Sequence, residues 1–173
     1  RSAVVNGRSY QRDTYVYGKL VKSDPTLPEL NLEHMSYYLD YDFLNAYEQI
    51  SFKDSLSNSF YDKTKIINLN GMRYLSNINL SGNLILYSFD SLLIDSSAHL
   101  KDVLVIAPFV EIISGSSFTG QIISSQGIYI SNDCKLSYPS ILYLDRKDNE
   151  IAQITIGEGT VFNGAVYALK RFP

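Results

Sequence analysis

The spacing of large apolar residues in the second half of the chain restricts its fold more than any other feature of the sequence. Intervals of eighteen residues separate Ile94, Ile112 and Ile130. Each is followed after six residues by a second large apolar residue (Leu100, Phe118, Leu136) and after four by a small one (Ala98, Ser116, Cys134). The same internal spacing recurs at Ile156, Thr160 and Phe162, displaced by eight additional residues. Such a repeat is typical of stacked units that bury their apolar faces only against neighbouring units.

The length of the repeat predicts the shape of each unit. Eighteen residues divide into three sides of six residues each. Six residues supply a strand of about four residues, which rises ~3.3 Å per residue, and a corner. Three sides close a triangular coil, and successive coils stack at the ~4.8 Å spacing of neighbouring strands. We therefore expect a mainly β protein, a parallel β-helix. Its inward ladders follow the six-residue step: Ile94, Leu100, Ile106, Ile112, Phe118, Ser124, Ile130, Leu136 and Leu142.

Two departures from the repeat predict where the coils are interrupted. The interval from Leu80 to Ile94 is two residues longer than the later equivalents, which predicts a bulged corner around Ser88–Phe89–Asp90. The insertion from Asp145 to Gln153 contains the run Asp-Arg-Lys-Asp-Asn-Glu. A run of charges of this kind predicts a solvated loop that leaves the coil.

The chain divides into three predicted segments. Residues 1–29 read as an N-terminal β segment, with a partial coil as the alternative, because Tyr15–Val16–Tyr17 has strand character. Residues 30–62 read as a helical insertion or cap, and residues 63–173 as the parallel β-helix. The helical prediction rests on apolar residues at mixed three- and four-residue intervals: Met35, Tyr38, Leu39, Phe43, Ala46, Tyr47 and Ile50.

Charge and cysteine content argue against two classes of function. The net charge is −3 with a pI near 5.3, and no basic run is present, whereas nucleic-acid binders concentrate basic residues to neutralise phosphates. Cys134 is the single cysteine and occupies the small-residue position of the repeat, so we expect it to be buried in the core. Without a Cys/His cluster, a zinc site is not expected.

Two known β-helix classes share features with the coils. Ile106–Glu111 and Ile156–Val161 resemble the hexapeptide repeat of left-handed β-helix acyltransferases. The coils over 80–169 also resemble bactofilins, which are polymer-forming proteins with right-handed coils. That second resemblance rests on alternating residues after the second ladder: Val103, Val105 and Ala107, then Gln121, Ile123 and Ser125. We expect right-handed coils, with the left-handed form as the alternative.

Motifs outside the coils resemble an uncharacterised family of membrane-anchored bacterial envelope proteins. They comprise Tyr10 with Tyr15–Lys19, Ser23 with Leu27–Leu30, and Tyr138–Ser140. The resemblance implies a hydrophobic N-terminal anchor followed by a β-rich ectodomain outside the cytoplasm. No apolar run of the printed sequence approaches the ~20 residues of a membrane span. We therefore expect Arg1 to lie within the ectodomain, with the membrane reached only through an anchor that precedes it.

No set of residues predicts a catalytic, cofactor or metal site. Glycosidase chemistry needs two carboxylates at a defined separation, and the aligned coils spread Asp90, Asp95 and Asp102 over different corners. His99 lies in a corner where its side chain is expected to point outward, and His34 lies in the predicted helical segment without an evident partner.

The sequence therefore favours a non-enzymatic structural or assembly module of the cell envelope. Such a module acts through a protein partner or self-association, because end coils of a β-helix expose strand edges. Two alternatives stay open. A carbohydrate-binding or carbohydrate-processing β-helix would align exposed tyrosines, for which Tyr87, Tyr129 and Tyr143 are the candidates. A hexapeptide-type acyltransferase would place His99 at a subunit boundary as general base.

Overall fold

The computed structural model describes residues 37–146 and 151–170. They belong to one of two compact units, Glu33–Pro173. The other unit, Arg1–Leu32, lies outside the described residues, and with it the predicted N-terminal β segment and the Tyr10–Leu30 motifs.

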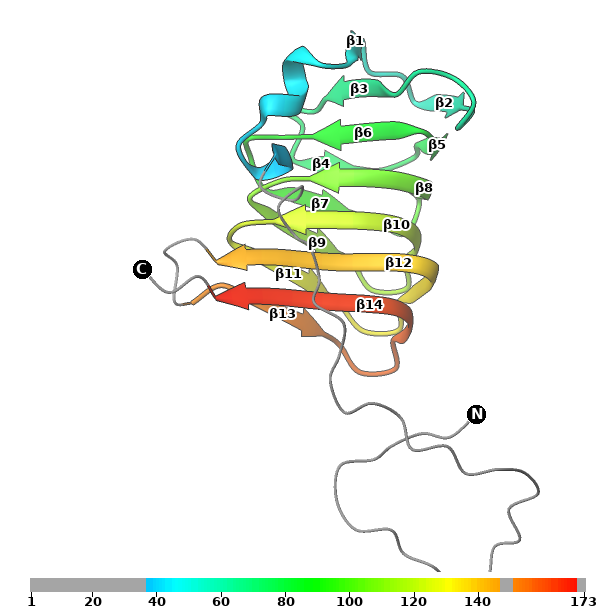
Figure 1. Cartoon of the computed structure of the whole chain (residues 1–173). Coiled ribbons are helices and arrows are strands. Elements are labelled where there is room, and N and C mark those ends of the chain that lie inside the picture. Colours follow the sequence, from blue (N-terminus) through cyan, green and yellow to red (C-terminus); the bar gives the residue numbers. More distant parts are fainter. Residues whose placement is uncertain (1–36, 147–150, 171–173) are drawn as a thin grey trace, which may run out of the picture. The chain divides into compact units, whose positions relative to one another are not determined.

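The described part is built from two parallel β-sheets (Figure 1). The nine-stranded sheet contains β1 (Glu48–Ile50), β2 (Ser55–Asn58), β3 (Lys65–Asn68), β5 (Asn79–Gly82), β6 (Leu84–Tyr87), β8 (His99–Ile106), β10 (Ser117–Ser124), β12 (Lys135–Arg146) and β14 (Val161–Lys170). The five-stranded sheet contains β4 (Tyr74–Leu75), β7 (Leu92–Ile94), β9 (Phe109–Ile112), β11 (Gly127–Ile130) and β13 (Gln153–Ile156). From β6 onward the chain alternates between the sheets, and we call one crossing of both sheets a pass. The prediction of a mainly β protein with parallel strands is confirmed.

The strand register confirms two of the predicted ladders. In the five-stranded sheet Ile94 pairs with Ile112, Ile112 with Ile130, and Ile130 with Ile156. In the nine-stranded sheet Leu100, Phe118, Leu136 and Phe162 pair in that order. The core cluster includes most of these residues, and Cys134 is buried beside them as expected. The eight additional residues before Ile156 are therefore accommodated without disturbing either ladder.

The third predicted ladder is wrong, by one position at Ile106 and by two positions at Leu142. Ile106 pairs with Ile123 rather than Ser124, and Leu142 pairs with Ile122. The cause is a bend within the long strands, because the register of β8 and β10 shifts between Thr119 and Gly120. The number of residues at this bend differs from pass to pass. A constant step of six residues therefore predicts the wrong pairs beyond the bend.

Close backbone approach explains glycine at the bend. Gly120 has φ of 150°, and a Cβ atom there would collide with the carbonyl oxygen of Val103. Asp102 in the preceding pass has φ of 58°. In the next pass the bend holds Ser137–Pro139, so the predicted motif Tyr138–Ser140 lies within β12. Each long strand therefore bends, and its two halves run in different directions within the sheet.

The two residues that lengthen the interval from Leu80 to Ile94 are separated in the structure. One lies at the bend, because Leu80 pairs with Leu100 while Ile85 pairs with Leu104. The other lies in the turn after Tyr87, which pairs with Ile106. The predicted bulge at Ser88–Asp90 therefore accounts for half of the extra length.

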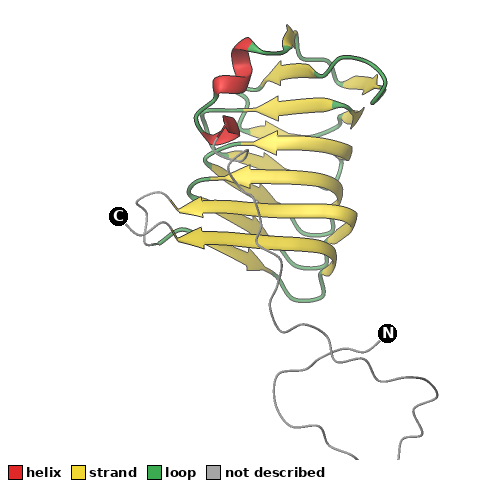
Figure 2. Ribbon diagram, in the orientation of Figure 1, coloured by secondary structure: helices red, strands yellow, loops and turns green. Residues whose placement is uncertain are grey.

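The prediction of helix over residues 30–62 is wrong for much of the described part. Helical turns occur at residues 37–39 and Asp42–Asn45 (Figure 2), and residues from Glu48 onward join the sheets as β1 and β2. Ile50, Phe52 and Leu56 are partly buried and pack against the core. Ile50 lies three residues after Tyr47 and four after Ala46, a spacing that fits a helix although Ile50 belongs to β1, and this explains the incorrect prediction.

Aromatic side chains of the helical turns pack on the outer side of the nine-stranded sheet. Phe43 is fully buried, and its ring centroid lies 5.9 Å from that of Tyr87. Tyr41 lies 4.7 Å from Phe89 by the same measure. Edge-to-face and tilted arrangements of this kind are favourable beyond the area that they bury. These residues of the predicted insertion therefore pack against the nine-stranded sheet and the turn after β6.

The predicted solvated insertion is shorter than expected. Asp145 belongs to strand β12 and is fully buried, and Gln153 begins β13. Residues 147–150 lie outside the described residues. The charged run made the whole insertion look solvated, although its first and last residues continue the strands.

Candidate functional site

The C-terminal end of the two sheets exposes residues that are buried everywhere else in their columns. We call this surface the open end; it consists of the outer edges of β13 and β14 with Ile154, Ile156, Phe162 and Val166. Ile130 is 0% exposed, whereas its partner Ile156 is 40% exposed. Leu142 is 0% exposed, whereas its partner Val166 is 44% exposed. At this end the apolar core is therefore partly exposed to solvent.

Two strand edges border the exposed core residues. Among the described residues β14 pairs only with β12, and β13 pairs only with β11. A strand at the edge of a sheet presents backbone N–H and C=O groups that can pair with another chain. The open end therefore combines apolar side chains with free hydrogen-bonding capacity.

The opposite end of the sheets differs in size and chemistry. Its edge strands β1 and β2 contain three and four residues, compared with ten in β14. Ile50, Phe52 and Leu56 cover the core there and are themselves partly buried. The exposed Glu48 and Gln49 in β1, and Lys53 and Asp54 after it, make this edge polar. Such an end matches the way natural sheets protect their edges.

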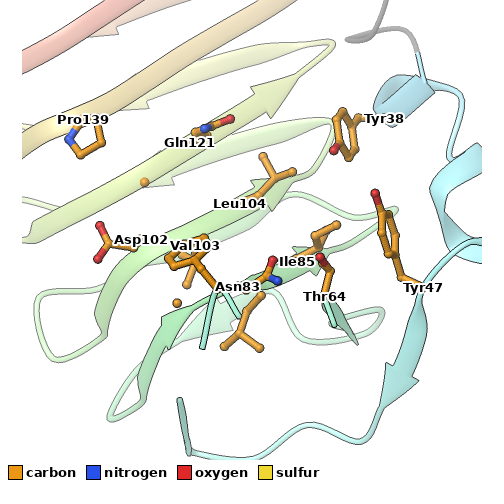
Figure 3. A pocket seen from close by; sticks show the side chains of 14 residues that line it. Tyr38, Tyr47, Thr64, Asn83, Ile85, Asp102, Val103, Leu104, Gln121 and Pro139 are labelled. Carbon is orange, nitrogen blue, oxygen red and sulfur yellow. Dashed lines mark hydrogen bonds between the residues drawn. The ribbon is translucent and has the colours of Figure 1, made fainter. Parts of the chain in front are cut away.

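A second hollow surface follows the bend of the nine-stranded sheet. This pocket, which we call the groove, has a volume of about 370 Å³. Figure 3 shows Tyr38 and Tyr47 on one side of it and Asp102 and Pro139 on the other. Pro139 also borders a hollow of about 570 Å³ that continues past Tyr138 towards Gly164.

The lining of the groove combines aliphatic, aromatic and polar side chains. Leu84, Ile85, Val103 and Leu104 contribute to its lining, and Phe60 is exposed at its rim. Among its described lining residues Asp102 is the one acid. Burial and then the neighbouring hydroxyl of Tyr47 raise the pKa of Tyr38, so this tyrosine stays neutral at physiological pH. The groove can hold an uncharged ligand against aromatic rings.

Polar groups at the groove are already engaged with one another. The Thr64 hydroxyl lies 2.9 Å from Oδ1 of Asn83, and the Asn83 side-chain amide donates to the carbonyl of Asp62 at 3.0 Å. These bonds fix the orientation of the Asn83 side chain. The wall of the groove is therefore ordered before any ligand arrives.

The three candidate tyrosines do not form one surface. Tyr87 and Tyr143 lie in the nine-stranded sheet and are 3% and 1% exposed, whereas Tyr129 lies in the five-stranded sheet and is 39% exposed. This distribution contradicts the expected tyrosine platform. Tyr87 is buried because the rings of Tyr41 and Phe43 pack on it, and the spacing of the tyrosines in the sequence does not reveal this contact.

The acids considered for catalysis have separate surroundings. Asp90 lies 3.6 Å from the guanidinium of Arg73. Asp95 accepts hydrogen bonds from the backbone and hydroxyl of Ser97 and from the hydroxyl of Tyr74, and these bonds lower the pKa of Asp95. Asp102 lines the groove. No two of them share a partner within the part of the chain that the structure describes.

The one histidine among the described residues is His99. His99 is exposed on β8, where it borders a shallow hollow with Lys101 and Ser117. His34 lies outside the described residues. Across residues 37–146 and 151–170, no three His, Cys, Asp or Glu side chains are grouped to hold a metal ion. Nor does that part of the chain contain a helix long and apolar enough to cross a membrane.

Comparison with known proteins leaves the site to be interpreted from its own geometry. No family model, curated protein or solved structure matches the chain.

The sequence predicted exposed strand edges at the end coils but not which end is open, and it gave no prediction of the groove. The sequence does contain an indication of the open end, because the stretch from Val161 to Leu169 has no charged residue. The groove has none, because it brings together Tyr38, Tyr47, Asp102 and Pro139 from distant parts of the chain.

Proposed function

We propose that the chain is a right-handed parallel β-helix that serves as a non-enzymatic assembly module of the bacterial cell envelope. Its coils are the passes through the two sheets. The alternation of strands between sheets and the preserved 18-residue register support this fold. In Figure 1 the front strands run to the left, those behind run to the right, and the chain advances downward from β1 to β14. A chain that advances in this sense winds right-handed, as parallel crossovers normally do.

The observation that carries the proposed function is the open end. Burying the remaining surface of an apolar side chain that is about 40% exposed contributes about 1 kcal/mol, and pairing a free strand edge adds backbone hydrogen bonds. A protein that covers Ile156 and Val166 would gain both contributions. The module is therefore suited to hold another protein at one defined end. The extracytoplasmic location and the N-terminal anchor form part of the proposal and rest on the motif resemblance.

A site-specific photo-crosslinker at Val166 tests this function in the full-length protein within cells. We expect a discrete crosslinked species, because this side chain faces the partner. The same crosslinker at Ser117, which is exposed on the outer side of β10, should give no such species. Equal crosslinking at both positions, or none at Val166, would refute the proposal.

Carbohydrate binding in the groove is the second candidate function. The observation in its favour is the pairing of Tyr38, Tyr47 and Phe60 with the polar groups of Asp102 and Asn83. Hydrolysis normally employs two carboxylates, so the single acid in the described lining favours binding over cleavage. Calorimetric titration with envelope glycans should give heat that a Tyr47→Ala variant loses. Identical titrations of both proteins would refute this candidate.

A further inference from the structure

We propose that a second copy of this chain covers the open end, with the two copies related by a two-fold axis. In this arrangement the β14 strands of the two copies pair antiparallel. The inference rests on the proposed function, because it names the partner of the same surface. It also defines the assembly as a closed dimer.

The first argument is the length and composition of the β14 edge. The strand spans ten residues, and its first nine, Val161–Leu169, contain neither a charged residue nor a proline. Natural proteins protect exposed edges with lysine, proline, short strands or covering segments. Among the described residues of this edge the one such device is Lys170 at the end of β14, whereas β1 and β2 at the other end are short strands joined by a segment that contains Lys53. The edge is thus suited to pairing.

The second argument is that the two ends of the sheets do not complement each other. Head-to-tail stacking would set the ten residues of β14 against strands of three and four residues. It would also place Ile156 and Val166 near the charged side chains of Lys53 and Asp54. Two open ends, in contrast, have identical lengths and equally apolar surfaces. A two-fold axis is the symmetry that brings identical surfaces together.

The symmetry fixes the direction of the strands and the size of the assembly. A two-fold axis perpendicular to β14 reverses the strand, so β14 meets its copy antiparallel although every strand pair among the described residues is parallel. Val166 lies near the middle of β14 and lies opposite its counterpart when residues 162–170 of the two strands overlap. Both open ends are consumed in this contact. The dimer therefore does not grow into a filament.

Sedimentation equilibrium of the purified chain tests the inference across a dilution series from about 1 to 100 µM. We expect a monomer–dimer equilibrium. A Val166→Lys variant should raise the dissociation constant by about 100-fold or more, because each copy would bury an unpaired ammonium. The matched Ser117→Lys variant adds the same charge to the outer side of β10 and should dimerise like the original protein.

A cysteine variant tests the geometry independently of stability. Val166→Cys should form a disulfide-linked dimer under mild oxidation, whereas Ser117→Cys should stay monomeric after the same treatment, with both variants sized under denaturing, non-reducing conditions. A wild-type monomer over the whole series, species larger than a dimer, or equal crosslinking of both variants would overturn the inference. If Val166 instead crosslinks to a different envelope protein while the purified chain is monomeric, the second copy is refuted and the assembly function stands.

Discussion

Replacing Ile112 by alanine tests whether the passes are stacked around one continuous core. Ile112 lies in the middle of the column Ile94–Ile112–Ile130–Ile156 and is fully buried. Removing three carbons forfeits about 2.4 kcal/mol of transfer free energy at ~0.8 kcal/mol per group. The neighbouring passes hold the cavity open, so the total loss of unfolding free energy should be about 3–4 kcal/mol.

The same substitution at Ile156 is the matched control. Ile156 occupies the same column but is 40% exposed at the open end. Only part of its transfer free energy is at stake, and surrounding water fills the space that is left. We expect a loss of about 1 kcal/mol. Urea unfolding followed by circular dichroism measures both values, with the denaturant dependence expected to be unchanged. Equal losses at the two positions would refute the stacked core.

Three further changes have defined outcomes. Gly120→Ala should lower the unfolding free energy by more than about 1 kcal/mol, because the added Cβ meets the carbonyl of Val103; a thermal melt like that of the original protein would contradict this. Ser124→Ala should cost about 1–3 kcal/mol, since its buried hydroxyl lies 2.9 Å from one backbone carbonyl and accepts from a backbone amide at 3.2 Å. Asp95 has a lowered pKa because Ser97 and Tyr74 donate to it, so its stabilising contribution is complete above its unfolded pKa and disappears as the pH falls through the folded value. A carboxyl NMR titration of Asp95 should have its midpoint below 3.8, and a midpoint above that value would exclude the effect.

The ladders were predictable because their spacing is set locally. Ile94, Ile112 and Ile130 pair at intervals of 18 residues, because β10 has one residue fewer than β8 at the bend and the turn that follows β10 has one residue more. The ladder through Ile106 failed because the bend near Gly120 has a different number of residues in each pass. A glycine in a strand pattern indicates such a bend but not how many residues it absorbs.

The candidate sites were harder to predict than the ladders. The open end depends on where stacking stops, and Val166 has the same apolar character as the buried Leu142 with which it pairs. No residue type distinguishes a core position from one at the last pass. The strands of the first pass were not predicted for a different reason. Ile50 and Phe52 follow a tyrosine-rich segment whose apolar spacing also fits a helix.

Amide hydrogen exchange of the full-length protein in its assembled state, followed by mass spectrometry, tests the central claim most directly. Pairing of a free strand edge protects its amides, and this protection is read peptide by peptide. We predict that slowed exchange relative to the dissociated chain is concentrated in β13 and β14, while peptides from β8 and β10 are unchanged. Unaltered exchange in Val161–Leu169 together with protection elsewhere would contradict the assignment of the open end as the contact surface.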